Sequence, residues 1–176
     1  FGSAVVLLGR DMYQESAYLY QQAASFVRAD LVTVEQVGDA PAVAPVEVAA
    51  ARAEEAVLLA RESLALDPGN AGAWMVLAWG HLMSGDAAPS LEALRVSWRL
   101  APYNFNLAGE RVSLSLTLFD PGLYDAGEVP ALTEDVREGL SRDFETLWVQ
   151  RRNLYRLYAE EAQAMDLPVY TPPEGG

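Results

Sequence analysis

The sequence predicts an all-α protein, and three observations support this fold class. The chain of 176 residues is 51% hydrophobic and 21% charged, which is typical of a globular protein with its own core. Apolar residues recur at spacings of three and four in several segments, the period of an α-helix with a buried face. A stretch of eight residues also returns 34 residues later in a related form, which indicates stacked helical units.

The N-terminal part is predicted to hold one helix and a linker. Residues 10–31 carry an apolar stripe at helical spacing. Residues 1–8 are apolar but too short to span a bilayer, which takes about 20 residues. We expect them to be a strap on the core or the remainder of a removed signal peptide or membrane anchor. Residues 32–46 then read as an extended linker, because one glycine and two prolines interrupt the helical pattern: Gly38, Pro41 and Pro45.

Four further helices are predicted between residues 46 and 119. Turn-forming residues separate them, since proline cannot continue a helix and glycine, asparagine and aspartate favour turns. The turns are expected at residues 67–70, 84–86 and 101–104, and the last helix ends at Asp120-Pro121-Gly122. The predicted helices are residues 46–66, 71–84, 88–100 and 105–119.

The C-terminal part is predicted to be a looser segment followed by a long helix or a bent pair of helices over residues 133–166. Thr133 is the expected N-cap, and acidic residues follow it in the first turn, where the helix dipole favours them. The expected organisation is a strap and helix (1–31), a linker (32–46), a helical core (47–122), capping helices (123–168) and a flexible tail (169–176).

The internal similarity defines one complete repeat unit, residues 71–104. Residues 63–70 return as residues 97–104, with serine, leucine, proline and asparagine coinciding at four of eight positions. The unit also holds a characteristic set of residues in a fixed order. An aromatic residue comes first, followed by a leucine with a small residue after it, then a histidine, and a proline near the end. These residues are Trp74, Leu77, Ala78, His81 and Pro102.

This unit resembles the tetratricopeptide repeat, whose pattern is Trp, Leu-Gly, Tyr and a late Pro over 34 residues. His81 stands in place of the aromatic residue and Ala78 in place of the glycine. The flanking units are degenerate halves, and in the later one Ala108 and Arg111 stand where tryptophan and leucine are expected. The resemblance implies a short stack of antiparallel helix pairs, closed at both ends by non-repeat capping helices because stability needs roughly three stacked repeats. It also implies a non-catalytic protein–protein interaction scaffold or assembly subunit.

Residues 71–85 are the candidate binding segment, because they contain no charged residue unless His81 is protonated. One apolar stripe is expected to face the partner helix, which leaves a second apolar stripe to be buried by something else. The functional interpretation is a concave groove for an apolar or amphipathic peptide. The alternative is that other helices of the same chain fill the groove, permanently so in a structural subunit of a complex. The predicted groove residues are Met75, Trp79, Leu82 and Met83 with Asn106, Gly109 and Ser113.

The acidic balance of the chain argues against nucleic acid as a partner. The net charge is −13, whereas binding to a phosphate backbone needs Lys and Arg to release counterions. We therefore expect the binding partner to be another protein or a peptide. The partner and this chain could both belong to a larger complex. Cysteine is absent, which removes disulfides, thiolate zinc sites and thiol nucleophiles. No cofactor and no metal site are predicted.

Catalytic chemistry finds little support in the residue pattern. His81 is the only histidine, and in a core stripe we expect a packing residue rather than a ligand or base. Paired carboxylates lie on helix faces expected to be exposed, unlike the opposed pair of a glycoside hydrolase. We predict no catalytic residue and no enzyme. The alternative is an accessory or catalytic domain that acts on polysaccharide or peptide through carboxylates near 120–145: Asp120, Asp125, Glu134 and Asp135.

A basic and aromatic cluster covers residues 148–158 and includes Arg151, Arg152 and Arg156. It is expected either to meet anionic lipid headgroups or to be a capping helix whose arginines pair with acids one turn away. All 12 basic residues of the chain are arginine, which suggests a GC-rich bacterial genome. A cell-envelope complex would fit this source. Periplasmic, membrane-associated and cytoplasmic locations all stay open.

Overall fold

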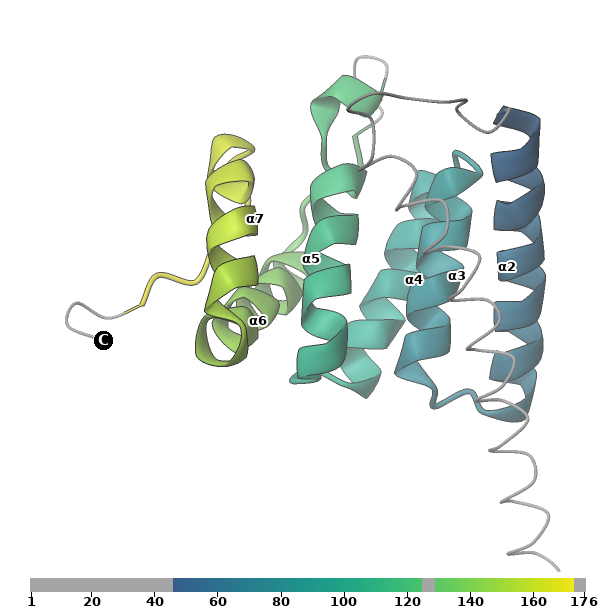
Figure 1. The fold of residues 1–176 in the computed structure, drawn as a ribbon, viewed down its shortest axis with the longest axis horizontal. Coiled ribbons are helices and arrows are strands. Elements are labelled where there is room, and N and C mark those ends of the chain that lie inside the picture. The colour runs from purple at the N-terminus through teal and green to yellow at the C-terminus, as the bar shows by residue number, and fades with distance from the viewer. Residues whose placement is uncertain (1–45, 125–128, 173–176) are drawn as a thin grey trace, which may run out of the picture. The chain divides into compact units, whose positions relative to one another are not determined.

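The structure is a computed structural model that describes residues 46–124 and 129–172, and this part of the chain is all-helical, without a strand (Figure 1). The predicted all-α class is therefore confirmed. The strap, the helix over 10–31 and the linker up to residue 45 lie outside the described residues. The described elements are α2 (Val46–Leu66), α3 (Ala71–Met83), α4 (Ala87–Leu100), α5 (Phe105–Leu118), the 3-10 helix η1 (Pro121–Leu123), α6 (Glu134–Gln150) and α7 (Arg152–Ala164).

The predicted helix boundaries agree with the observed ones to within one or two residues. The long C-terminal segment is a pair of helices, because the backbone of Arg151 leaves the helical region with φ −146° and ψ 64°. Thr133 stands at the predicted N-cap of α6, but its hydroxyl makes no hydrogen bond to the helix backbone. That hydroxyl instead accepts a hydrogen bond from Arg95 and donates one to Asp135, so the predicted capping contact is wrong.

The repeated asparagines are helix N-caps, which gives the 34-residue similarity a physical basis. The side-chain oxygen of Asn70 accepts the backbone N–H of Ala73 at 3.0 Å at the start of α3. The side-chain oxygen of Asn104 accepts the N–H of Asn106 at 3.0 Å at the start of α5. Each cap satisfies one backbone donor that the first helical turn leaves without a partner.

The chain divides into two compact units, and the boundary between them falls between Ala93 and Leu94, within α4. In the first unit α2 and α3 lie side by side and antiparallel (Figure 1). They approach closely at Gly80, where an added Cβ would lie 2.5 Å from a methyl carbon of Val57. Small residues of α2 on the same face are fully buried: Ala53, Ala56, Ala60 and Ser63.

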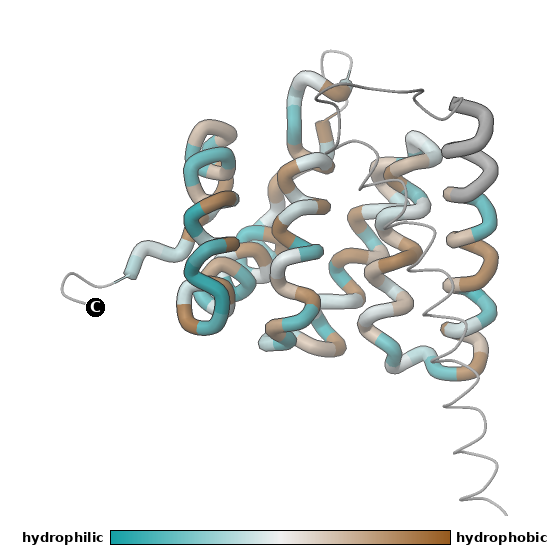
Figure 2. Tube along the Cα trace, in the orientation of Figure 1, coloured by the Kyte–Doolittle hydropathy of each residue, from teal (hydrophilic) through white to brown (hydrophobic). Residues whose placement is uncertain are grey.

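In the second unit α6 packs against α5 and α7 packs against both. In this unit α5 is buried on most of its sides, including the consecutive residues 114–116, whereas α7 alternates hydrophobic and hydrophilic positions along its length (Figure 2). The side chains that are fully buried in α5 and α6 include Val112, Leu114, Leu118, Val136, Leu140, Phe144 and Leu147. None of the described helices is long and apolar enough to cross a membrane.

Candidate interaction surface

The predicted groove residues differ widely in exposure. Met75 and Trp79 are only 1% and 5% exposed, so a partner would reach them only after neighbouring groups move. Leu82 and Met83, at the end of the same helix α3, are half-buried. On α5, Asn106 is exposed, whereas Gly109 and Ser113 are half-buried. The α3 residues belong to the first unit and the α5 residues to the second.

Gly109 is covered by α7 in the second unit. A Cβ built at this glycine would lie 3.4 Å from a methyl carbon of Leu154 and 4.0 Å from one of Leu147. Side chains of α6 and α7 therefore already contact the part of α5 that the sequence assigned to a binding groove. The surface of the second unit that is open to a partner lies elsewhere.

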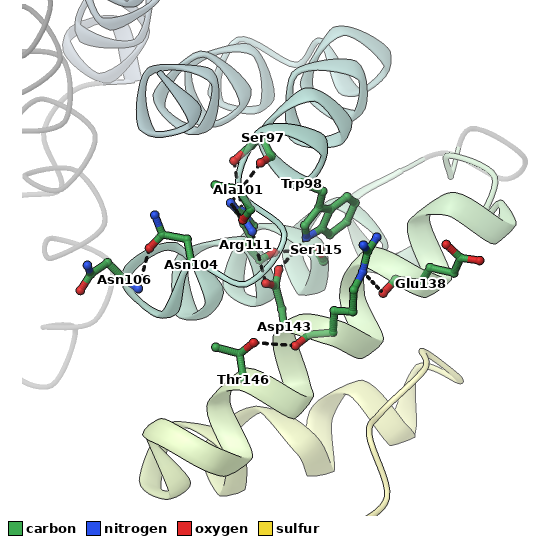
Figure 3. A network of polar contacts seen from close by, with 11 residues as sticks. Ser97, Trp98, Ala101, Asn104, Asn106, Arg111, Ser115, Glu138, Asp143 and Thr146 are labelled. Carbon is green, nitrogen blue, oxygen red and sulfur yellow. Dashed lines mark hydrogen bonds and ion pairs between the residues drawn. The ribbon is translucent and has the colours of Figure 1, made fainter. Parts of the chain in front are cut away.

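A fully buried arginine, Arg111, is the centre of a polar network in the second unit (Figure 3). Its guanidinium donates to the backbone carbonyls of Ser97 and Ala101, at 3.1 and 2.9 Å, and to the Ser97 hydroxyl at 3.1 Å. These carbonyls stand at the C-terminal end of α4 and also accept the backbone N–H groups of Ala101 and Asn104, and the helix dipole favours a cation there. Arg111 of α5 thus caps the end of α4.

Asp143 of α6 completes this network from the opposite side. One carboxylate oxygen lies 3.4 Å from Arg111 Nη1, and the other accepts the indole N–H of Trp98 at 2.6 Å. Both Arg111 and Asp143 are 0% exposed, so neither charge has water as a partner. The network therefore fixes α4, α5 and α6 to one another within the second unit.

Burial raises the pKa of Asp143 from its ordinary value of 3.8 to about 7, although Arg111 and Trp98 act in the lowering direction. Removing a carboxylate from water disfavours its charged form and raises its pKa. Here this increase is larger than the decrease caused by Arg111 and Trp98 together. Burial likewise lowers the pKa of Arg111, against the influence of the negative charge of Asp143.

This shift predicts that Asp143 makes the protein less stable as pH rises from about 4 to about 7. In that window the folded chain keeps a proton that the unfolded chain has released, so raising the pH favours unfolding. We expect the urea midpoint of the wild type, minus that of Asp143→Asn, to decrease between about pH 5.5 and about pH 8. The subtraction removes the contribution of His81, whose lowered pKa acts in the opposite direction. An identical pH dependence in both proteins would contradict the prediction.

The surface open to a partner lies where the α4–α5 turn meets the α6–α7 corner. Tyr103 and Phe105 at the turn are 68% and 48% exposed, and Val149 at the end of α6 is 65% exposed. Single exposed apolar side chains are normal on a protein surface, and Leu58 and Leu157 are as exposed as these, but apolar residues that gather at one place can mark an interaction site. We call this set the corner surface: Tyr103, Phe105, Trp148, Val149, Arg151 and Arg152.

Arginine side chains lie against aromatic rings in the corner surface. The guanidinium carbon of Arg151 is 5.8 Å from the ring centre of Phe105, and that of Arg152 is 4.5 Å from the ring of Trp148. Both distances are within the range of a cation–π contact. Among the described residues no carboxylate pairs with either arginine. The expected pairing with acids one turn away is therefore wrong for these two residues.

Aromatic packing supports the corner from inside. The ring of Tyr155 makes edge contacts with Trp148 and Phe144, at centre distances of 5.2 and 6.0 Å. Its hydroxyl donates to the backbone carbonyl of Tyr170 at 2.8 Å. The α6–α7 corner is thus held by rings from both helices and by the segment that follows α7.

Three of the other residues that the sequence marked as candidates make structural contacts: His81, Asp120 and Asp135. His81 is half-buried, with its Nδ1 atom 3.8 Å from a carboxylate oxygen of Asp86, and burial together with Arg61 lowers its pKa. Asp120 caps η1 by accepting the N–H of Gly122 at 2.8 Å, and Asp135 pairs with Arg95 at 2.8 Å. Glu134 is exposed, and Asp125 lies outside the described residues. Within the described ranges no three His, Cys, Asp or Glu side chains gather as metal ligands would.

Comparison with known proteins adds no assignment: no family model matches the chain, and neither the curated proteins nor the solved structures contain a significant match.

Sequence reasoning missed Arg111, Asp143 and Phe105 as important residues. Arg111 was noted only as a departure from the repeat pattern, although an arginine inside the apolar stripe of α5 is a signal of a buried, fully bonded cation. Phe105 gave no comparable signal, because its arginine neighbour comes from a distant helix.

Proposed function

We propose that this protein is a non-catalytic protein–protein interaction scaffold, an adaptor or assembly subunit, that docks a partner protein on the corner surface. The observation that carries the proposal is the exposure of Tyr103, Phe105 and Val149 beside two arginines without a carboxylate partner among the described residues. Aromatic and arginine side chains are the types that most often dominate binding energy at protein interfaces.

The repeat unit of residues 71–104 supports the same role. Its tetratricopeptide-like pattern is that of helical stacks whose surfaces serve as binding scaffolds. We also propose a bacterial source, on the basis of the arginine-only basic composition.

Site-specific photo-crosslinking in the cells that naturally produce the protein tests this proposal. A photoreactive phenylalanine analogue replaces Val149 in the full chain, and a second version carries it at Ala164. Ala164 is exposed at the far end of α7, about 18 Å from the corner at 1.5 Å of helix per residue. We expect a discrete crosslinked protein from position 149 only.

The partner identified by crosslinking should then no longer co-purify with the Val149→Glu variant. It should still co-purify with the Ala164→Glu variant. Crosslinking that is equal at both positions, or co-purification that Val149→Glu leaves unchanged, would remove the corner surface from the proposed function.

A further inference from the structure

We propose that the corner surface binds an acidic segment of the partner protein, one that combines several carboxylates with an apolar side chain. The inference rests on the proposed function and adds the chemistry of the ligand. The observation behind it is a positively charged, aromatic surface on a strongly acidic chain.

The charge of the corner differs in sign from that of the whole molecule. Residues 99–109 and 148–159, which contain the corner surface, hold four arginines and no acidic residue, and the nearest acids along the chain are Glu92, Glu110, Glu145 and Glu160. The complete chain has a net charge of −13. Such a local reversal attracts an acidic ligand to one place and repels it elsewhere, which gives orientation as well as affinity.

The arginines keep their hydrogen-bonding capacity. A cation–π contact uses the charge of the guanidinium but satisfies none of its five N–H donors. Arg151 and Arg152 are both exposed and are held over the rings of Phe105 and Trp148. A guanidinium fixed in this way presents its donors to a carboxylate in bidentate geometry, at a smaller entropy cost than a free side chain.

Apolar contact completes the match. Tyr103 lies two residues before Phe105 in the chain and Val149 two residues before Arg151, and both have most of their surface in water. A purely acidic ligand would leave these side chains solvated, whereas a ligand with an apolar residue among its carboxylates would bury them. The surface therefore fits a mixed acidic and apolar sequence better than a run of acids.

The buried network makes the corner rigid. Arg111 holds the end of α4 through Ser97 and Ala101, next to the turn that carries Tyr103 and Phe105. Asp143 ties the same network to α6. Because the two halves of the surface are ordered before binding, less conformational entropy is lost when a ligand docks.

A short protein segment fits this surface better than a membrane or a nucleic acid. Exposed acids flank the corner on α6 and α7, among them Glu145, Glu160 and Glu161. An extended layer of phosphates or lipid headgroups would meet these acids as well as the arginines, and the repulsion would offset the attraction. A peptide can place its carboxylates over the arginines and its other residues near these acids.

Fluorescence anisotropy with two labelled ten-residue peptides tests the proposal on the full chain. Both probes carry the same tryptophan and leucine, and the remaining positions are mainly glutamate in one and glutamine in the other. We expect the glutamate peptide to bind at least about tenfold more tightly at low salt, since charge-assisted contacts to arginine contribute on the order of a tenfold change or more. The difference shrinks as salt is added.

Two double variants separate the corner from general charge. Arg151→Ala with Arg152→Ala is expected to weaken the glutamate peptide at least about tenfold, while Arg61→Ala with Arg137→Ala, which removes the same charge elsewhere, changes affinity less than about twofold. All four side chains are exposed, so thermal unfolding of both variants should stay near that of the wild type. Charge reversal, Arg151→Glu with Arg152→Glu, should transfer the preference to a lysine peptide.

The proposal fails if the two peptides bind equally or if both double variants lose affinity alike. It also fails if phosphatidylserine vesicles bind the corner in flotation assays while the peptides do not, or if the arginine variants alter only self-association of the chain. A partner crosslinked at Val149 that binds independently of salt and of Arg151 and Arg152 would overturn this inference and leave the proposed function standing.

Discussion

Replacing Arg111 by methionine is expected to lower the free energy of unfolding by about 3–5 kcal/mol at pH 8. The substitution fills a similar volume but removes the cation that faces Asp143, which is itself 0% exposed. At that pH the wild-type carboxyl group of Asp143 is mostly ionised, because its pKa is about 7. Without Arg111, which lowers that pKa, the buried group must either keep its charge without a partner or take up a proton, and both cost free energy. The carbonyls of Ser97 and Ala101 would lose their guanidinium donor as well. Urea unfolding followed by circular dichroism measures the difference.

Two further variants show whether the loss comes from the broken pair. Arg111→Met together with Asp143→Leu replaces both charges by apolar groups and should recover part of the stability, since a buried ion pair contributes little net energy over a packed apolar pair. Recovery stays incomplete because the buried N–H of Trp98 loses its acceptor. Arg137→Met, on the exposed face of α6, should change stability by no more than about 0.5 kcal/mol. If Arg111→Met costs no more than this surface control, Arg111 is not the centre of the network.

Gly139→Ala is expected to destabilise the protein by about 1–3 kcal/mol, although alanine is the better helix former. An added Cβ would lie between 2.5 and 2.8 Å from three atoms of the Trp98 ring. That ring is 3% exposed, and its N–H is held by Asp143 at 2.6 Å, so it cannot move away without breaking a buried hydrogen bond. Thermal unfolding of the purified variant gives the change.

Gly109→Ala is the matched comparison, because it makes the same chemical change within a helix of the same unit. Here the added Cβ would lie 3.4 Å from Leu154, an ordinary van der Waals contact. We expect this variant to be neutral or stabilised by up to about 1 kcal/mol through the helix preference of alanine. Equal changes in stability at the two glycines would show that helix propensity determines both changes. The Trp98 ring would then have shifted to make room for the added methyl group.

Most of the fold was predictable from the sequence because its signals are local. Asn70 and Asn104 each begin a helix through a contact with a residue two or three positions away, and prolines beside them stop the preceding helices. The break at Arg151 was predicted only as one alternative, since no glycine or proline marks it. It depends on tertiary contacts of the aromatic rings around it.

The interaction surface could be predicted only in part. The cluster of arginines and aromatic residues after Trp148 was visible, but the contact of Arg151 with Phe105 joins helices that are distant in the chain. Local spacing favoured ion pairs one turn away. Arg152 instead contacts the ring of Trp148, four residues earlier, and Arg151 contacts the ring of Phe105 at the start of α5. The apolar stripe containing Met75 and Trp79 was also visible, but the pattern alone did not decide whether it is buried.

The polar network around Arg111 also bears on how long the folded state persists. Its side chains are separated along the chain by 14, 32 and 45 residues. Contacts over such separations close long loops, and the entropy of loop closure delays them relative to the turns and caps within each helix pair. Interactions that form after the folding barrier slow unfolding more than they speed folding. We therefore expect the network to slow the unfolding of the second unit more than it speeds its folding, so that both halves of the corner surface stay in place longer.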